Sequence, residues 1–570
     1  MMAAPSIWKH SPENTSIADK IANSLSLHPL VARLLVNRGI TSESEALLFL
    51  RPTIDQLHDP FRMTDVQAAV DRILVAIQQH EQIAVHGDYD VDGVTATVII
   101  CRVLSLLGAN VVHHIPNRLS DGYGLSSKGI DHLKETGTTL IVTVDCGIKS
   151  TVAAERARAV GVDLIITDHH QPGHALPSAL AVINPHRQDC RYPDKNLAGV
   201  GVAFKLVQAL CQRTNHNHWL SPILKLVALG TIADVVPLQG ENRVMARLGL
   251  NEFAKDRNSK GLQALIDSCQ LNKKRISSYE IGFLLAPRIN AAGRMASADI
   301  AVRLLLAMGD TDQDDAKLLA ETLARENSRR RSEEGQVFEA ALRLIESNPD
   351  VRDSKLLITW GRGWHRGVIG IVASKLKERF NCPAIVFSIE GGLAYGSARS
   401  VPGFHFLNAI EECADLLEEF GGHSQAAGMV IQAKDLEELR TRLSNVVNRD
   451  LNQEQLSRSF VIDATVRLSD ITPALMDELE TLEPFGRKNA KPIFQVNSVE
   501  IVNGPHVIKN THLRMTVNQD GYNFRAMAWR AAGRISEFRG RRSDLQLLVS
   551  LSRNSYGGET FIQLDIADIK

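Results

Sequence analysis

The sequence predicts an α/β protein of several domains, because two kinds of pattern follow each other along a long chain. The chain has 570 residues, which at about 100–200 residues per domain suggests three or four domains. From Gln82 onward, short apolar runs alternate with helical stretches. This alternation is typical of a parallel sheet, because parallel neighbours need crossover connections that a helix supplies. Residues 458–570 instead alternate apolar and polar residues, which favours a small β-barrel.

Composition and charge place the chain among ordinary globular proteins. Hydrophobic residues at 44% and charged residues at 23% exclude a disordered, collagen-like or coiled-coil chain. The net charge of -1 means that any surface for a polyanion must be a local patch. Seven scattered cysteines without a CxxC pair indicate reduced thiols, and no run of apolar residues is long enough to span a membrane. We therefore expect a cytoplasmic monomer that makes no contact with a membrane.

The first half of the chain predicts one helical extension and one large domain. Residues 1–80 have helical periodicity interrupted by prolines, and we expect an N-terminal helical extension there. Residues 81–310 predict a doubly wound parallel sheet, with mostly helical structure over 198–256. The charged amphipathic stretch over 311–346 favours a connecting helix with a solvated face over a binding site.

The second half predicts two further domains. Residues 347–450 have a second, smaller α/β pattern, with a helix near 406–419 that leads into the sequence GGHSQAAG. Residues 458–570 contain five or six short alternating segments, and the OB-fold is the usual nucleic-acid-binding barrel of this kind. Between 503 and 570 there are 10 basic and 6 acidic residues, interleaved with aromatic residues such as Trp529. That mixture fits a platform for single strands, and an ordinary barrel with solvated arginines is the alternative.

The most informative stretch is VHGDYDVDGVTA at residues 85–96, where the first predicted strand meets its helix. His86, Asp88 and Asp90 lie at the carboxyl end of that strand, where open parallel sheets place ligands. Carboxylates spaced i, i+2, i+4 repel one another, so a divalent cation is expected to neutralise them. We expect Asp92 to cap the helix that follows.

Three later segments also end in acids or histidines. Asp145 ends the run LIVTVD, and Asp234 ends LVALGTIAD. The run LIIT leads into Asp168, His169 and His170. An oxygen-rich set with a few imidazoles suits Mn²⁺ or Mg²⁺ better than zinc, and so many ligands suit two ions rather than one. The predicted ligands are His86, Asp88, Asp90, Asp145, His169 and Asp234.

The motifs HGDYDVDG, VTVDCG, DHH and ADVVP occur in this order, and together they resemble the four sequential motifs of the DHH phosphoesterase family. The segments GRGWHRGVIG, GSARS and GGHSQAAG resemble the second domain associated with that family, DHHA1. The resemblance extends from about residue 45 onward. It implies a DHH domain, a DHHA1-like domain and an OB-like barrel. The implied activity is that of a single-stranded-DNA-specific 5′→3′ exonuclease that releases 5′-mononucleotides in DNA recombination and repair.

The resemblance also implies a role for each residue of the cluster. Asp145 is implied to bridge two divalent cations, Mn²⁺ or Mg²⁺. The other ligands are implied to be His86 and Asp88 for one ion, and Asp90, His169 and Asp234 for the other. Asp168 is implied to orient its neighbour, since a ligating imidazole needs its other nitrogen fixed, and His170 to touch the scissile phosphate. Adjacent histidines also arise by chance, and we place His113 and His114 in that class.

An exonuclease with polarity must recognise one end of a strand. Glycine permits close backbone approach to a phosphate, and arginine binds it through a fork of donors. The resemblance implies that Ser397, Arg399, Gly421, Gly422 and His423 bind the 5′-terminal phosphate. For GGHSQAAG, a glycine-rich turn before a strand is the structural alternative.

Contacts with the rest of the DNA strand are expected from two more segments. Arg288, Asn290 and Arg294 in PRINAAGRM resemble a family segment that lines the cleft between the domains. Arg118 and Tyr123 could contact the strand by charge and stacking. Besides single-stranded DNA, the family suggests a single-strand-binding protein and a helicase as partners.

Two alternative functions share these motifs. Some DHH relatives hydrolyse pyrophosphate, short oligonucleotides or cyclic dinucleotides, but they are typically shorter and lack a C-terminal β block. A non-catalytic replication scaffold also occurs among the relatives. The chain departs from the motif pattern at none of the ligand positions, which favours an active nuclease.

Overall fold

The computed structural model describes residues 6–12, 14–118, 122, 124–255, 257–271, 275–452, 454–540, 542–556 and 558–570. The chain forms two compact units. The smaller unit contains Met1–Trp8, Arg294–Ala296 and Thr322–Phe460, and the larger unit contains Lys9–Gly293, Ser297–Glu321 and Val461–Lys570. Among the described residues, no helix has the length and apolar character needed to cross a bilayer.

The N-terminal extension is mostly helical, as predicted, but it begins with a strand. β1 (Ile7–His10) pairs with β12 (Ser459–Ile462). The helices that follow are α1 (Thr15–Leu25), α2 (Pro29–Asn37), α3 (Glu43–Leu50) and α4 (Val66–Gln78). Pro29 occupies the first turn of α2, where its missing N–H would have no helical partner. Leu34 and Leu35 of α2 are buried in the same apolar core as Phe494 and Val496 of the C-terminal barrel, so the extension packs on the barrel.

A five-stranded parallel sheet forms the centre of the larger unit, as the sequence predicts. Its strands are β2 (Gln82–Gly87), β3 (Asn110–His114), β4 (Thr138–Val144), β5 (Asp163–Thr167) and β6 (Ala181–Ile183). Their order is β3-β2-β4-β5-β6, and every neighbouring pair is parallel. The direction of winding therefore reverses between β2 and β4, and such a switch point is where open sheets bind ligands.

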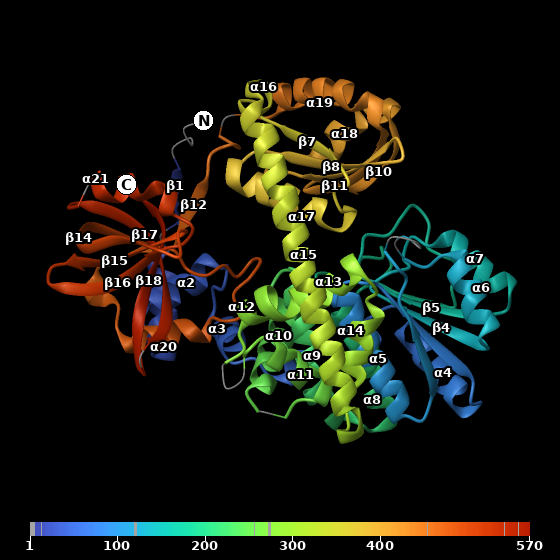
Figure 1. Cartoon of the computed structure of the whole chain (residues 1–570). Helices are drawn as coiled ribbons and strands as arrows, with labels where there is room; N and C mark the ends of the chain where they lie inside the picture. The colour runs from blue at the N-terminus through green and yellow to red at the C-terminus, as the bar shows by residue number, and fades with distance from the viewer. Residues whose placement is uncertain are drawn as a thin grey trace. The chain divides into compact units, whose positions relative to one another are not determined.

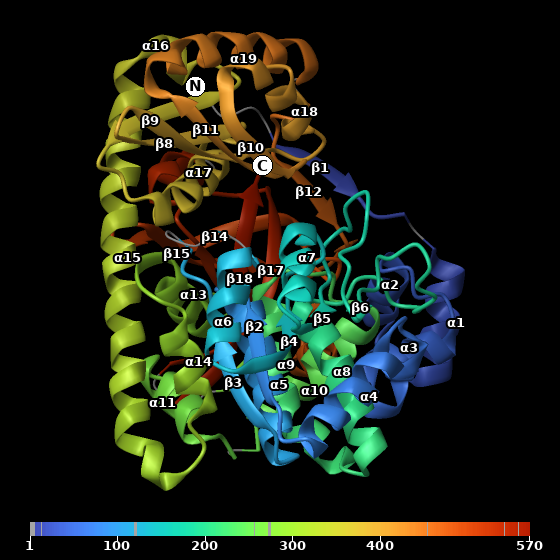
Figure 2. The same ribbon diagram turned by 90° about the vertical axis from the view of Figure 1, so that its right-hand side faces the viewer.

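Helices cover both faces of this sheet (Figures 1 and 2). α6 (Ser127–Glu135) and α7 (Thr151–Ala159) pack on one face, where they share a core with alternate residues of β2, β4 and β5. α5 (Val91–Leu106) and α8 (Gly199–Thr214) contact the sheet as well as each other. α9 (Leu220–Ala233) and α10 (Gly240–Phe253) complete the helical region predicted over 198–256.

A series of further helices follows. They are α11 (Lys260–Ser268), α12 (Ser278–Glu280), a π-helical segment (Ile281–Leu285), α13 (Ala286–Met295) and α14 (Asp299–Leu306). The long charged helix predicted over 311–346 is α15 (Gln313–Ser347).

The smaller unit has a mixed sheet. Its strands are β7 (Leu357–Arg362), β8 (Ala384–Glu390), β9 (Leu393–Arg399), β10 (Leu417–His423) and β11 (Ala426–Gln432), in the order β10-β11-β9-β8-β7. β7 and β8 run parallel, and the other neighbours run antiparallel. The unit also has α16 (Pro349–Arg352), α17 (Arg366–Phe380), α18 (Phe406–Glu411) and α19 (Leu436–Asp450). The prediction of a helix near 406–419 is wrong at its C-terminal boundary, because α18 ends at Glu411 and β10 begins at Leu417.

The C-terminal block forms the predicted OB-like barrel. Its strands are β13 (Ala464–Thr465), β14 (Phe494–Ile508), β15 (His512–Gln519), β16 (Tyr522–Ala528), β17 (Leu545–Tyr556) and β18 (Glu559–Ile569). They follow the order β13-β14-β15-β16-β18-β17, and β17 pairs back onto β14, which closes the barrel. α20 (Pro473–Thr481) precedes β14, and α21 (Ile535–Gly540) precedes β17. Alternate residues such as Val496, Leu513 and Val549 fill the interior.

Candidate functional site

Acids and imidazoles from four segments meet in the larger unit. Three overlapping groups each have their ligand atoms within 4.8 Å of one another. The groups are Asp88, Asp90 and Asp145; Asp145, His169 and His170; and Asp92, His169 and Asp234. Asp145 joins the first two groups and His169 joins the last two, so five of the six predicted ligands form one connected cluster. His86 belongs to none of the three groups, although it is the second-last residue of β2 and is buried.

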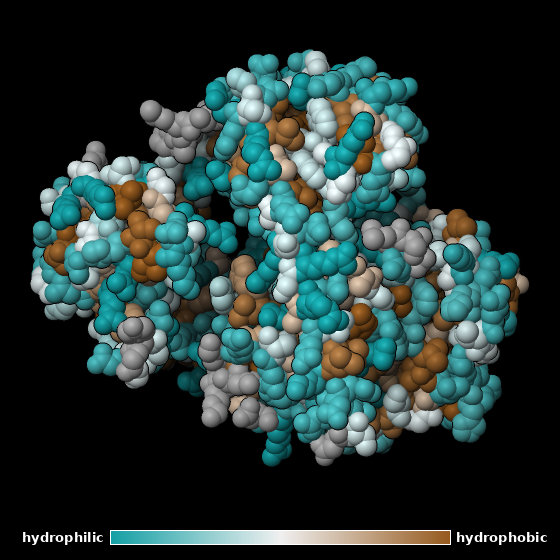
Figure 3. Space-filling view, in the orientation of Figure 1, coloured by the Kyte–Doolittle hydropathy of each residue, from teal (hydrophilic) through white to brown (hydrophobic). Residues whose placement is uncertain are grey.

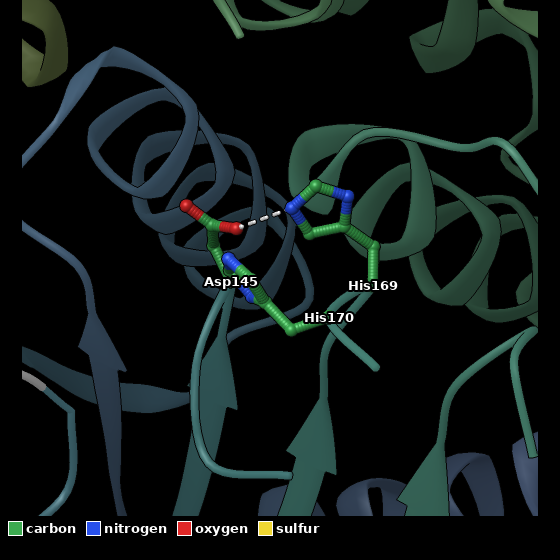
Figure 4. A group of neighbouring side chains, drawn as sticks. All are labelled: Asp145, His169 and His170. Carbon is green, nitrogen blue, oxygen red and sulfur yellow. Dashed lines mark ion pairs between the residues drawn. The ribbon is translucent and has the colours of Figure 1, made fainter. Parts of the chain in front are cut away.

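Asp145 is held at the centre by local backbone geometry. It directly follows β4 and has a positive φ of 60°, and its backbone N–H donates to the Thr167 carbonyl at 3.0 Å. Its Oδ1 lies 3.2 Å from His169 Nε2 (Figure 4). A Cβ atom on Gly199 would lie 2.3 Å from Asp145 Oδ1, so the start of α8 needs glycine to come this close.

The two histidines of the DHH sequence have different partners. His169 Nδ1 lies 3.1 Å from the Leu197 carbonyl, and this contact directs Nε2 toward Asp145. Asp168 Oδ1 instead lies 2.7 Å from His170 Nδ1, so Asp168 does not fix the imidazole predicted as a ligand. Asp168 orients His170. The backbone carbonyl of Leu197 fixes the ring of His169, which is the role that we expected of Asp168.

The predicted role of Asp92 is wrong. Asp90 caps α5, since its Oδ1 accepts from the backbone N–H of Gly93 at 3.1 Å. The buried Asp92 carboxylate accepts from the backbone N–H groups of Gly199 and Val200, at 2.7 and 2.8 Å. Asp92 thus binds the start of α8, a helix far along the chain, and ties it to the cluster.

Burial and mutual repulsion oppose ionisation of the acids. Burial, and then the charge of Asp90, raises the pKa of Asp88 to about 8. Burial, and then Asp92, raises the pKa of Asp234 to about 9, and the pKa of Asp145 also lies well above its usual value because of burial and the surrounding acids. Burial lowers the pKa of His169 to about 4, so its imidazole is neutral and able to bind a metal.

The chemistry of the donor set fits divalent cations. Among the described residues, the buried His86 Nε2 and Asp88 Oδ1 have no hydrogen-bond partner. Such atoms are costly to bury unless something binds them. Carboxylate oxygens with a few imidazoles are the donors that Mn²⁺ and Mg²⁺ accept. A cation would also offset the repulsion that raises the pKa values of these acids.

Metal binding should therefore release protons. At pH 7 the raised pKa values keep Asp88 and Asp234 protonated in the metal-free protein, whereas ligation needs carboxylates. We expect Mn²⁺ binding to release roughly one to two protons and to strengthen as pH rises from 6 toward 9. Calorimetric titration in buffers of different ionisation enthalpy measures the release directly. Binding heats independent of the buffer at pH 7 would contradict this expectation.

His114 is a contact that sequence reasoning missed. The parallel register places it beside His86, and the two Nδ1 atoms lie 3.0 Å apart with the rings stacked. His114 is thus in position to fix the ring of His86 while Nε2 of His86 points elsewhere. His113 on the other side of the strand pairs with Asp299 at 2.8 Å. Both histidines of this pair therefore have specific partners, and our chance interpretation was wrong.

Strand register in the smaller unit aligns the residues predicted to bind phosphate. On three adjacent strands, Arg399 pairs with Ala426, and Ala426 pairs with His423. Ser397 lies two residues before Arg399 and so shares its face of the sheet. Small residues stand between the polar side chains on this face, since Ala426 and Gly428 occupy β11. This face of the sheet therefore carries a hydroxyl and a guanidinium on β9 and an imidazole on β10.

The glycine-rich segment forms this edge of the sheet. The structural alternative, a turn before a strand, holds for Ser424 and Gln425, which precede β11, whereas Gly421 and Gly422 lie within β10. Gly422 has a φ of 150°, and a Cβ there would meet the Ala426 carbonyl oxygen at 2.4 Å. A Cβ on Gly370 of α17 would lie 2.9 Å from Ser397 Oγ and 3.0 Å from an Arg399 terminal nitrogen. The first turns of α17 thus approach both polar side chains closely.

The residues predicted to contact the DNA strand have varied surroundings. Arg118 lies over the Tyr89 ring, 4.9 Å from its centroid, and Tyr123 lies outside the described residues. Arg288 donates to the carbonyls of Leu284 and Ser268 in its own region. Asn290 accepts a hydrogen bond from the backbone N–H of Val91 at 3.2 Å. Arg294 donates to the backbone carbonyl of Gly367 at 3.2 Å. Arg118 and Asn290 therefore both contact the acid-rich loop, at Tyr89 and at Val91.

The barrel exposes cations and rings together. Arg525 lies over the Phe561 ring at 4.2 Å, and Tyr522 and Trp529 are half exposed. Trp529 contacts the His512 ring and donates from Nε1 to Asp565. Such pairs of cations and rings are typical of surfaces that bind single strands.

Three family models match the chain. They are the DHH family N-terminal domain over residues 82–231, the DHHA1 domain over 353–449 and the RecJ OB domain over 462–568. The parallel sheet with its acid and imidazole cluster thus defines a DHH-family protein. The single-stranded-DNA-specific exonuclease RecJ of Bacillus subtilis is 38% identical over 571 residues, covering 100% of this chain and 71% of the relative. The Escherichia coli protein of the same name is 34% identical, covering 92% and 95%.

Solved structures agree with these matches. The crystal structure of RecJ in complex with Mn²⁺ from Thermus thermophilus aligns with a TM-score of 0.84 at 28% identity, covering 99% of this chain and 79% of that one. A crystal structure of exonuclease RecJ bound to manganese aligns with a TM-score of 0.59 at 34% identity, covering 70% and 97%. The chain belongs to the RecJ family.

Proposed function

We propose that the protein is a single-stranded-DNA-specific exonuclease that degrades DNA from the 5′ end and releases 5′-mononucleotides in recombination and repair. The observation that carries the proposal is the meeting of acids and imidazoles from four distant segments at one end of a parallel sheet. Relatives that align with nearly the whole chain are named as exonucleases of this specificity. The full set of three matched domains favours this function over the shorter relatives that act on small substrates.

Two divalent cations, Mn²⁺ or Mg²⁺, are the proposed cofactors. His86, Asp88 and Asp145 would hold one ion, and Asp90, Asp145, His169 and Asp234 would hold the other. Support comes from the connected cluster and from relatives crystallised with each metal. When bound, such ions neutralise the phosphate and stabilise the leaving 3′-oxygen.

His170 is the proposed proton donor to the reacting phosphate. Its Nδ1 lies 2.7 Å from Asp168 Oδ1, and this contact fixes the orientation of the ring. Burial opposes the charge on His170, but the hydrogen bond and charge of Asp168 outweigh it and raise the pKa. The imidazolium form therefore persists to higher pH, and its Nε2–H can donate a hydrogen bond or a proton to the phosphate.

The smaller unit is the proposed reader of the 5′ end. Ser397 and Arg399 would bind the terminal phosphate, with His423 and the backbone of Gly422 on the neighbouring edge strand. Their common face and the close approach of α17 support this role. Arginine holds a phosphate through two parallel hydrogen bonds, which suits a site that must recognise a chain end.

For the whole molecule we propose a cytoplasmic monomer of five parts. These are the extension (1–80), the DHH domain (81–310), the connecting helix (311–346), the DHHA1-like domain (347–450) and the barrel (458–570). Arg118, Tyr123, Arg288, Asn290 and Arg294 are proposed contacts with DNA. An enzyme that accepts one flexible strand needs other proteins to expose it, so a helicase and a single-strand-binding protein are the proposed partners.

Single strands labelled separately at each end test this function. With Mn²⁺ present, we expect a 5′ label to appear at once in mononucleotides, while a 3′ label stays in shortening fragments. Removing the 5′-phosphate should slow digestion, and a duplex should resist it. Rapid cleavage of dinucleotides with long strands spared would favour a small-substrate phosphoesterase. No metal-dependent hydrolysis of any of these would favour a scaffold.

A further inference from the structure

Two large aromatic side chains are exposed side by side on the larger unit. Tyr279 and Phe283 are 60% and 62% exposed, and their ring centroids lie 4.9 Å apart with the rings inclined by 32°. In the shared orientation of Figures 1 and 3, apolar side chains reach the surface where Figure 1 labels α12. Large rings are expensive to leave in water, so an exposed pair indicates a surface that something covers.

The backbone under this pair is unusual. Tyr279 lies in α12, and Phe283 lies in the π-helical segment that follows it. Short π-helical segments within α-helices are rare and frequently mark functional sites. Gly282, between the two rings, has open space around it. The segment therefore presents both rings outward, each more than half exposed.

This segment reaches the proposed metal centre at one end and the barrel region at the other. Asn290 binds the N–H of Val91, the residue after Asp90. Arg275 pairs with Glu480 of α20 at 3.2 Å and with Glu483 at 2.9 Å, just before the barrel strands. The aromatic pair lies between these two anchors. From Phe283 to Asn290 the helix advances about 10 Å, which equals about three base steps at the 3.4 Å spacing of stacked bases.

The charge of the segment suits a polyanion. Between Leu271 and Asn290 there are four basic residues and one acidic residue, in a chain whose net charge is -1. The basic residues are Lys273 and Lys274, which lie outside the described residues, Arg275, which also pairs with Glu480 and Glu483, and Arg288, which donates to two backbone carbonyls. Aromatic rings among cations are how proteins hold single strands without reading their sequence, because every base has a face on which a ring can stack.

We propose that Tyr279 and Phe283 form a stacking site for bases of the DNA single strand, about three nucleotides from the scissile phosphate and on the way to the barrel. The inference rests on the proposed function, since it assigns these rings to the same substrate. The stacking site would hold the strand in line between the barrel and the cluster. It would favour any base equally and would gain nothing from a sugar–phosphate backbone that lacks bases.

The test compares two strands and two proteins in a binding cycle. The strands are 5′-phosphorylated oligothymidylates, one intact and one with abasic sites at the third to fifth positions. The proteins are the wild type and the double variant Tyr279→Ser with Phe283→Ser. Binding is measured by fluorescence anisotropy in EDTA, so that no strand is cut. We expect the double variant to bind the intact strand at least about fivefold more weakly, the lower end for loss of one stacked base, and to bind the abasic strand as the wild type does.

Matched variants separate stacking from general damage. Leu106→Ser removes a side chain that is also 60% exposed, at the end of α5, and should leave both affinities unchanged. Tyr279→Phe with Phe283→Tyr retains two rings and should keep the preference for the intact strand. Unchanged affinity in the serine variant, or an equal loss on both strands, would overturn the proposal. Because the binding assay needs no hydrolysis, a wild type that binds strands without cutting them would contradict the proposed function alone.

Discussion

Asp145→Asn should lower the Mn²⁺-dependent hydrolysis of single-stranded DNA by more than about 100-fold, because losing even an outer-shell partner of a metal ligand costs about 10–100-fold. Asp145 joins two of the three groups of acids and imidazoles. An amide offers a weaker oxygen donor and no negative charge, so both proposed ion positions lose their shared ligand. Asparagine keeps the shape and also tolerates the positive φ of 60° at this position. Initial rates with saturating strand and graded Mn²⁺ measure the loss.

The same substitution should not weaken the metal-free fold. The pKa of Asp145 is raised in the folded protein, so the folded state holds this proton more tightly than the unfolded state does. The free energy of unfolding therefore falls as pH rises toward the raised pKa, because the buried carboxylate must then carry a charge. A neutral amide avoids this cost, and we expect an equal or higher melting temperature in EDTA at pH 8. Mn²⁺ should raise the melting temperature of the wild type more than that of the variant. Asp163→Asn is the matched control, because Asp163 begins β5 and so lies at the end of the sheet opposite to the cluster. Undiminished hydrolysis by Asp145→Asn would remove Asp145 from the centre.

The sheet and most of the cluster could be predicted from sequence because both depend on short-range pattern. Buried parallel strands read as continuous apolar runs, and their carboxyl ends meet at one edge of the sheet. An acid directly after such a run, like Asp145 after LIVTV, therefore points to that edge without any knowledge of tertiary structure. The barrel could be predicted for a similar reason, since successive side chains of its strands point alternately to the core and to solvent.

The errors at the metal cluster concern contacts between distant segments. Asp92 precedes a helix and so has the appearance of a cap for it, but its carboxylate binds the start of α8, more than a hundred residues later. His114 was dismissed as a chance neighbour of His113, although β2 and β3 end at the same level and place it opposite His86. The sequence did contain a signal for this contact. VVHH ends the strand that follows helix α5, and the parallel neighbour of that strand ends just after His86. No local pattern could reveal the Leu197 carbonyl as the partner of His169.

Breaking the buried ion pair of Lys205 and Glu241 should destabilise the DHH domain by about 3–5 kcal/mol. Both side chains are almost fully buried, and Lys205 Nζ lies 2.9 Å from Glu241 Oε1. The same Oε1 accepts from the backbone N–H of His58, and Oε2 accepts from the Tyr192 hydroxyl at 2.6 Å. The pair thus fastens α8 and α10 to the N-terminal extension at His58. Lys205→Met leaves the Glu241 carboxylate buried without its counter-charge, which is the costly case.

Hydrogen exchange resolves this effect in a chain too large for two-state unfolding. Amides of α8 and α10 in Lys205→Met should exchange about 10²–10⁴-fold faster, which corresponds to 3–5 kcal/mol at 1.4 kcal/mol per factor of ten. Adding Glu241→Leu to this variant should recover much of the protection, because replacing both charges by apolar groups removes the unpaired charge. Arg213 lies on α8, like Lys205, and forms an exposed ion pair with Asp71 of α4. Asp71→Asn breaks this pair and should lower the stability of α8 by less than about 1 kcal/mol. If Lys205→Met and Asp71→Asn exchange alike, the buried pair contributes no more than a surface contact.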